Sequence, residues 1–221
     1  QNMIMQLSRS VEYLNCLPMT IVSIDNIEAD DSIAYISEQC LTDSNIVIMS
    51  TDKDFLQLVD DRVSVWSPVR KKLYKPNDIL EEYGIDSKNY IWYRVLDGDK
   101  SDNIPGVKGL GLKTIQKKFP FLNENRIVNI DEVIKELPNA KDVIELNYKL
   151  MQLSNVDISG NAKMKIRNLV NNPIQRLIKV DFQKMFLEDK LYAALPNLNS
   201  WLATTFNRLN NMAEKSYGKK T

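Results

Sequence analysis

Carboxylate side chains gather in three short segments of this chain, at spacings suited to binding divalent cations. Asp99 and Asp102 are three residues apart, a spacing that can place both side chains on one side of a helical turn. Grouping several carboxylates without a cation would cost roughly several kcal/mol of repulsion and desolvation. The candidate catalytic and metal-binding residues are Glu28, Asp30, Asp31, Asp52, Asp54, Asp99 and Asp102.

The types of residue present indicate which metal and which reaction to expect. The chain contains no histidine, which excludes His-based acid–base catalysis and His-ligated zinc. Carboxylate oxygens without His or Cys favour Mg²⁺ or Mn²⁺. Two such ions about 3.5–4 Å apart can activate water and stabilise the leaving oxygen of a phosphoryl displacement. The sequence therefore favours two-metal phosphoryl chemistry.

The first two acidic segments also have a simpler interpretation. Acids at residues 28–31 and 52–54 are common at helix N-termini, where they cap the helix or complement its dipole. Both segments, however, follow predicted strands, and open α/β sheets place their active sites beyond the carboxyl ends of strands. Asp97 has no role that we can assign.

A glycine-rich segment at residues 104–114 has the form of a helix-hairpin-helix turn. Closely spaced glycines let the backbone approach a phosphate, and the helix that follows offers free N–H groups. A plain glycine-rich connection is the alternative, and the basic run at residues 70–75 is more typical of a solvated hairpin. The residues expected to contact DNA are Gly106, Lys108, Gly109, Gly111, Lys113, Thr114 and Lys117.

Composition limits the partners and the compartment. Lys plus Arg (29) equals Asp plus Glu (29), so attraction to nucleic acid has to come from local placement of charge. Cys16 and Cys40 are too few for a disulfide framework and are expected in the core of a cytoplasmic protein. No apolar run is long enough to span a bilayer, so no membrane partner is expected.

The elements that position these residues divide into an α/β part and a helical part. We expect a mostly parallel central sheet with helices over residues 1–98, and helices with the hairpin element over residues 99–221. Apolar and β-branched runs predict strands at 20–24, 45–49, 62–66 and 72–75, the first two forming a parallel pair. Apolar periodicity predicts helices at 3–14, 30–40, 77–83, 88–96, 112–119, 130–137 and 139–153.

Three motifs in register carry a resemblance to the 5′-nuclease family, which includes phage flap endonucleases, phage RNase H-type 5′-exonucleases and the 5′-nuclease domain of bacterial DNA polymerase I. The motifs are Glu28-Ala29-Asp30-Asp31, Ser50-Thr51-Asp52-Lys53-Asp54-Phe55 and Gly98-Asp99-Lys100-Ser101-Asp102-Asn103-Ile104-Pro105-Gly106-Val107. The resemblance covers roughly residues 18–119. A weaker match at residues 146–151 extends it toward the C-terminus.

The resemblance implies the roles of the acids and the partners of the protein. Four acids would hold a first metal ion and three would lie toward a second: Glu28, Asp30, Asp31 and Asp52, then Asp54, Asp99 and Asp102. It also implies flap, nicked or 5′-ended DNA as substrate, with RNA primers in RNA–DNA hybrids, replication proteins and K⁺ at the hairpin turn as further partners. The expected location is the cytoplasm of a bacterial or phage-infected cell.

One departure from the family pattern leaves the activity of the chain open. Family members begin with a strand that carries a metal-binding aspartate, then a second acidic strand and a basic helical arch. We expect the chain to be a fragment, or half of a split nuclease, with a vacant sheet position between strands 20–24 and 45–49. The alternative to a structure-specific 5′-nuclease is a non-catalytic DNA-binding module.

Overall fold

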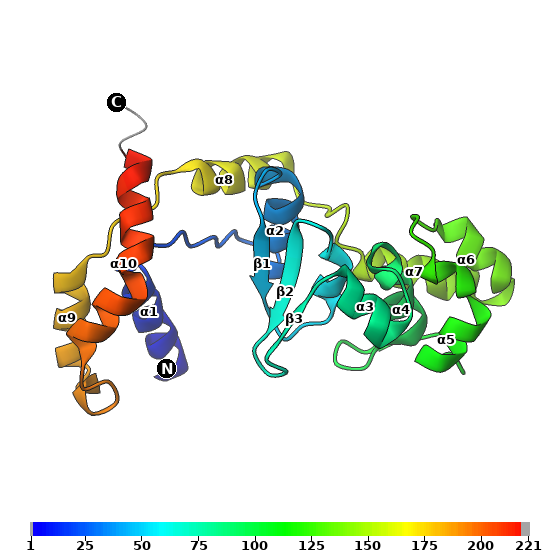
Figure 1. Cartoon of the computed structure of the whole chain (residues 1–221), viewed down its shortest axis with the longest axis horizontal. Helices are drawn as coiled ribbons and strands as arrows, with labels where there is room; N and C mark the ends of the chain where they lie inside the picture. Colours follow the sequence, from blue (N-terminus) through cyan, green and yellow to red (C-terminus); the bar gives the residue numbers. More distant parts are fainter. Residues whose placement is uncertain (1, 218–221) are drawn as a thin grey trace. The chain divides into compact units, whose positions relative to one another are not determined.

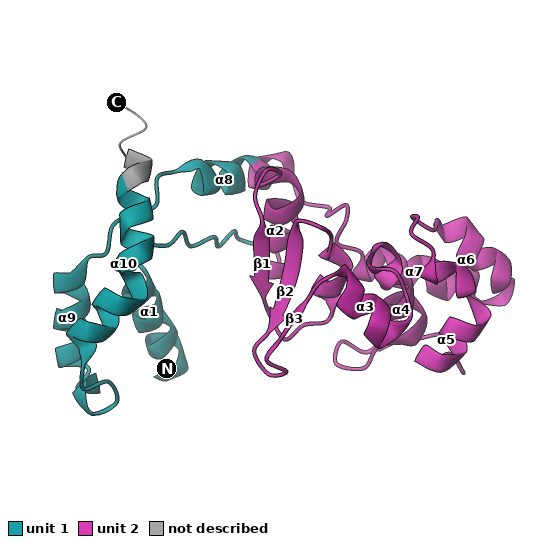
Figure 2. Cartoon of the chain, in the orientation of Figure 1, with its two compact units in different colours: residues 1–25, 164–221 teal, residues 26–163 magenta. Residues whose placement is uncertain are grey.

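The computed structural model describes residues 2–217 and divides the chain into two compact units. One unit combines residues 1–25 with residues 164–221, and the other comprises residues 26–163 (Figure 2). The boundary expected at residue 98 lies inside the second unit. The prediction that an α/β part ends and a helical part begins near residue 98 stays a prediction.

A three-stranded sheet forms one side of the unit at residues 26–163 (Figure 1). Its order is β1 (Ile46–Met49), β2 (Val63–Ser67) and β3 (Lys72–Tyr74). β1 pairs with β2 in parallel, and β2 pairs with β3 antiparallel. The α/β class is confirmed, although the sheet is mixed where a mostly parallel one was expected. The predicted helix at 30–40 is also confirmed, as α2 (Ala29–Tyr35) continued by a π-helical turn, η1 (Ile36–Cys40).

The strand expected at residues 20–24 is wrong, because this segment is irregular in the structure. A β-branched run forms a strand only where it pairs with a neighbouring strand, and residues 20–24 belong to the other unit, whereas β1 pairs in parallel with β2. The vacant position expected between segments 20–24 and 45–49 is therefore not a feature of this sheet. β1 lies at an edge of the sheet, with Val47 62% and Met49 73% exposed.

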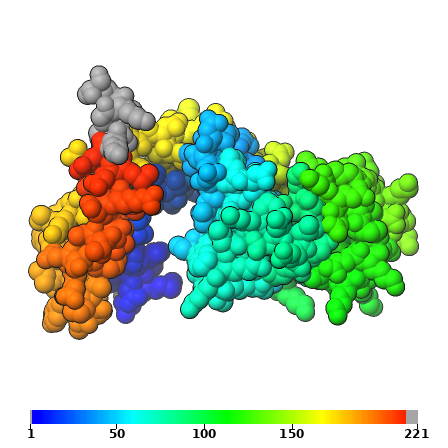
Figure 3. Space-filling view, in the orientation of Figure 1, coloured from blue at the N-terminus to red at the C-terminus, as the bar shows by residue number. Residues whose placement is uncertain are grey.

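Helices make up most of the rest of this unit, together with one short two-stranded hairpin. α3 (Pro76–Tyr83) begins at a proline and ends at Gly84, whose φ of 62° closes the helix. α4 (Tyr90–Asp97) packs against α7 (Lys141–Met151), where Trp92 stacks on Tyr148 with ring centroids 5.0 Å apart. The remaining elements are η2 (Asp54–Leu58), η3 (Ser87–Asn89), β4 (Gly98–Asp99), β5 (Ile104–Pro105), α5 (Leu112–Lys118), η4 (Pro120–Asn123), α6 (Ile130–Glu136) and η5 (Pro138–Ala140). The cyan and green residues form one continuous body in the space-filling view (Figure 3).

The other unit is helical and has its own apolar core. It contains α1 (Asn2–Leu14), α9 (Lys179–Glu188), η6 (Leu191–Ala193) and α10 (Leu198–Tyr217), while α8 (Gly160–Asn171) carries the boundary between the units. Its core consists of Cys16, Leu17, Phe182, Phe186, Leu202 and Phe206. Across residues 2–217, no helix has the length and apolar character that a membrane crossing requires.

Candidate active site

The second acidic segment is a tight turn that follows the carboxyl end of β1. Ser50 Oγ accepts a hydrogen bond from Asp52 N at 3.0 Å, and Asp52 Oδ1 accepts one from Asp54 N at 2.8 Å. The short helix η2 then buries Phe55 and Leu56, which anchor the turn in the core. Asp52 thus caps its own turn, as the simpler interpretation expects, while Asp54 faces other side chains.

The third acidic segment is a hairpin of two short strands, β4 and β5. Gly98 has a φ of 77°, and a Cβ atom added there would lie 2.3 Å from Gly106 N. Only glycine fits such a close approach of two backbones. Asp99 follows Gly98 directly and accepts hydrogen bonds from the Ser101 backbone N–H, at 2.7 Å, and from the Ser101 hydroxyl. These bonds, with the nearby Arg94 guanidinium, lower the pKa of Asp99 to about 2.

Arg94 joins the second and third acidic segments. Its Nε donates to Asp54 Oδ1 at 2.5 Å, and its Nη2 donates to Asp99 Oδ2. Burial still raises the pKa of Asp54, because the loss of water around this carboxylate outweighs the nearby guanidinium. Sequence reasoning missed Arg94. Its signal is a cation within the otherwise apolar and aromatic run of residues 90–96 in α4.

Two side-chain amides, of the buried Asn147 and the half-buried Gln57, hold the same segments by their backbones. Asn147 Nδ2 donates to Val95 O at 3.0 Å and to Pro105 O at 2.9 Å. Gln57 Nε2 donates to Asp54 O and to Met151 O, each at 2.9 Å. Asn147 thus ties the third acidic segment to α7, and Gln57 ties the second to the end of α7. Nothing in the sequence pattern marks either residue.

These segments enclose a polar cavity of about 640 Å³. It brings Asp52, Asp99 and Asp102 together from two of the three acidic segments. Asp97, to which the sequence assigned no role, also lines it. The full lining is Thr51, Asp52, Lys53, Arg94, Asp97, Gly98, Asp99, Lys100, Ser101 and Asp102.

The first acidic segment lies within electrostatic reach of the second. Glu28 is the N-cap of α2 but makes no side-chain capping hydrogen bond. Burial raises the pKa of Asp30, and the carboxylates of Asp52 and Asp54 raise it further. The pKa of Asp31 is raised by burial, by Glu28 and by Asp157, a further acid that sequence reasoning missed.

The donor set fits a hard divalent cation by its chemistry. Its oxygens are carboxylate oxygens, which hard divalent cations prefer. Burial first, and neighbouring carboxylates after it, raise the pKa of Asp30 and of Asp54, so a bound cation would stabilise their ionised forms. In the part of the chain that the structure describes, no three acidic, Cys or His side chains are already arranged to hold a metal ion. The assignment of individual ligands stays a prediction.

The glycine-rich segment forms an exposed turn that leads into α5. Gly109 has a φ of 83°, and Cβ atoms added at Gly109 or Gly111 would meet nothing within 4 Å. Gly111 O accepts from Thr114 N and Ile115 N at 2.9 and 3.0 Å, which starts the helix. The backbone here is open to a ligand from outside.

Comparison with known proteins decides the family. The family model described as "5′-3′ exonuclease, N-terminal resolvase-like domain" matches residues 1–84. The 5′-3′ exonuclease of Aquifex aeolicus is 33% identical over 190 residues, covering 82% of this chain and 65% of that relative. A thermostable DNA polymerase I of Thermus thermophilus is 35% identical over 153 residues, covering 67% of this chain and 18% of that protein. The chain belongs to the 5′-nuclease family.

Solved structures share the fold of this family member. A mutant of the bacteriophage T5 5′-exonuclease has a TM-score of 0.51 at 22% identity, over 75% of this chain and 68% of that one. A bacteriophage T5 flap endonuclease in complex with DNA and metal ions also has a TM-score of 0.51, at 21% identity over 75% of this chain and 61% of that one. The chain spans 61–65% of the length of the curated 5′-3′ exonucleases that it matches.

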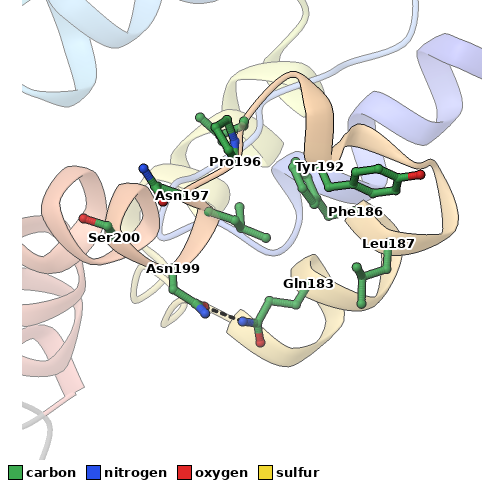
Figure 4. A pocket seen from close by; sticks show the side chains of 10 residues that line it. Gln183, Phe186, Leu187, Tyr192, Pro196, Asn197, Asn199 and Ser200 are labelled. Atoms are coloured by element: carbon green, nitrogen blue, oxygen red, sulfur yellow. Dashed lines mark hydrogen bonds between the residues drawn. The ribbon is translucent and has the colours of Figure 1, made fainter.

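A second cavity, of about 500 Å³, lies in the helical unit and differs in character. Phe186 and Leu187 of α9 and Tyr192 of η6 line it, and Gln183 donates to Asn199 at 2.5 Å across its rim (Figure 4). It contains no acidic residue. The candidate metal-binding acids all lie in the unit at residues 26–163 instead.

Proposed function

We propose that this chain carries the nuclease site of a structure-specific 5′-nuclease, acting as a 5′→3′ exonuclease and flap endonuclease on branched or nicked DNA and on RNA primers in hybrids. The observation that carries the proposal is that Asp54 and Asp99, from two separate acidic segments, converge on one buried arginine. A DNA-binding module without activity has no need of such a site, and the named relatives are nucleases and polymerases.

The acids have separate positions around the proposed two-metal site. Glu28, Asp30, Asp31 and Asp52 would hold one divalent cation, and Asp54, Asp99 and Asp102 the other. Bound Mg²⁺ or Mn²⁺ supplies an activated water and neutralises the leaving oxygen. The cavity beside Asp52 and Asp99 has room for a phosphodiester, and the exposed Lys53 and Lys100 offer charge to its oxygens.

The hairpin element would hold the duplex portion of the substrate. Its open glycine backbone and its lysines would contact the sugar–phosphate backbone of DNA without recognising the base sequence. Carbonyl oxygens of the same turn are suited to K⁺, which would bridge the turn to a phosphate. The residues proposed to contact DNA are Gly106, Lys108, Gly109, Gly111, Lys113, Thr114 and Lys117.

Replacing one acid tests the nuclease activity. Asp52→Asn should lower the rate on a 5′-flap substrate with Mg²⁺ by about 100-fold or more, because several kcal/mol of metal-dependent stabilisation are lost. The rate is measured at saturating substrate. Asp142→Asn, an exposed acid in the first turn of α7, serves as the matched control and should leave the rate unchanged. Equal rates for both variants would contradict the proposed site.

A further inference from the structure

Arg94 lies between two carboxylates from segments far apart in the sequence. Its side chain is 7% exposed, and those of its partners Asp54 and Asp99 are 16% and 15% exposed. Among the residues that the structure describes, it is the one charged residue that is buried. A guanidinium this far from water needs carboxylate partners, and both carboxylates in turn depend on it.

The shape of the arginine side chain suits this position. A guanidinium presents N–H groups in a fixed planar fork, so one side chain can bind two carboxylates at once. Lys53 and Lys100 line the same cavity, but both are exposed to solvent, where a charge pair contributes little. Arg94 is therefore the cation that balances Asp54 and Asp99 inside the protein.

We propose that Arg94 is a positioning residue that acts as the built-in counter-ion of Asp54 and Asp99. It holds both carboxylates in place before a divalent cation binds, and it competes with that cation for their oxygens. The proposal rests on the function proposed above. Without Arg94, the two carboxylates lose their counter-charge. A bound divalent cation then provides the stabilisation that Arg94 provides in the wild type.

The test compares wild type with Arg94→Met, using Mn²⁺ alone as the probe. In EDTA, the variant should melt about 5 °C or more below wild type, because two partly buried carboxylates are left without a cation. Saturating Mn²⁺ should restore most of this loss, and calorimetric titration should show a Kd for Mn²⁺ about tenfold lower than in wild type. A role in packing alone would lower Tm without making it depend on Mn²⁺.

Two further variants make the comparison specific. Arg94→Lys keeps one positive charge but cannot bind both acids in a fork, so its Tm in EDTA and its gain with Mn²⁺ should be intermediate. Arg126→Met is the matched control, because Arg126 also bridges two acids, Glu124 and Glu132, but on the surface at 42% exposure. It should leave both Tm and the Kd for Mn²⁺ near the wild-type values.

The outcomes separate this proposal from the proposed function. If wild type binds no Mn²⁺ and cleaves no 5′-flap, the proposed function is overturned. The proposal that a cation can replace Arg94 as counter-ion then falls with it. If wild type binds Mn²⁺ but Mn²⁺ raises the Tm of Arg94→Met no more than that of wild type, only the proposed role of Arg94 is overturned. If Arg94→Met folds only with Mn²⁺, the proposal holds. If it does not fold at all, Arg94→Lys decides by the same two measurements.

Discussion

Asn147 and Gln57 are uncharged residues that hold the acidic segments in position through hydrogen bonds to backbone carbonyls. Asn147, only 1% exposed, donates to backbone carbonyls on either side of the third acidic segment, and Gln57 donates to Asp54 O in the second segment and to Met151 O at the end of α7. A buried carbonyl without a donor costs about 1–3 kcal/mol, so these contacts fix the backbone as firmly as apolar packing does. The position of Asp99 thus depends on a residue of a helix that comes much later in the chain.

We expect Asn147→Leu to reduce the free energy of unfolding by about 1–3 kcal/mol, because the carbonyls of Val95 and Pro105 lose their shared donor. Urea unfolding measures the change. Lys149→Leu, an exposed position on the same helix, should change it by less than about 0.5 kcal/mol. Equal effects of the two substitutions would show that the amide is dispensable.

At the residue level, sequence indicates the acids better than their partners. Glu28, Asp30, Asp52, Asp54 and Asp99 stand out because carboxylates in clusters are costly without a cation. Their partners stand out less. Arg94 interrupts an apolar and aromatic run, but an asparagine such as Asn147 on an amphipathic helix looks like a surface residue until the fold buries it. Contacts between residues that are distant in the sequence leave no local pattern to find.

At the level of elements, helices with strong apolar periodicity are predictable and short strands are less so. α4 and α7 match their predicted ranges within two residues at each end, because amphipathic spacing and neighbouring turns define them locally. Residues 20–24 have strand-forming composition but no ladder partner, so they stay irregular. The hairpin of β4 and β5 escaped prediction, because only the close approach of Gly98 to Gly106 forms it.

The glycine-rich turn and α5 form the element on which DNA affinity should depend. We expect Lys108→Ala with Lys113→Ala to weaken binding to duplex DNA of any sequence and to reduce the salt slope of log K by about 2, since each lysine should neutralise about one phosphate. Binding is measured by fluorescence anisotropy over a range of salt concentrations. The rate of cleavage at saturating substrate should change much less.

A pair of lysines on another helix provides the control for this element. Lys141→Ala with Lys149→Ala removes the same charge from α7, and both positions are exposed. This variant should keep the wild-type salt slope. If the two double variants behaved alike, the effect would be one of net charge, and the glycine-rich segment would be a plain connection.

At the scale of the whole molecule, the proposed chemistry is confined to one unit. All seven candidate acids, Arg94 and the glycine-rich turn lie within residues 26–163, whereas the core around Phe182 and Leu202 belongs to the other unit. Each unit buries its own apolar residues, which is what a separately folding domain requires. The metal site should therefore survive the removal of the helical unit.

We expect a chain of residues 26–171, which keeps α8 whole, to fold cooperatively and to bind Mn²⁺ with a Kd within about threefold of the full chain, since no candidate ligand lies outside it. Calorimetric titration with Mn²⁺ and thermal unfolding followed by circular dichroism measure both properties. The same shortened chain with Asp52→Asn should lose the binding, which separates the site from adventitious association with other acids. An unfolded chain, or a folded one that no longer binds Mn²⁺, would mean that residues 1–25 or 172–221 contribute to the site. The separation into two units would then describe packing but not function.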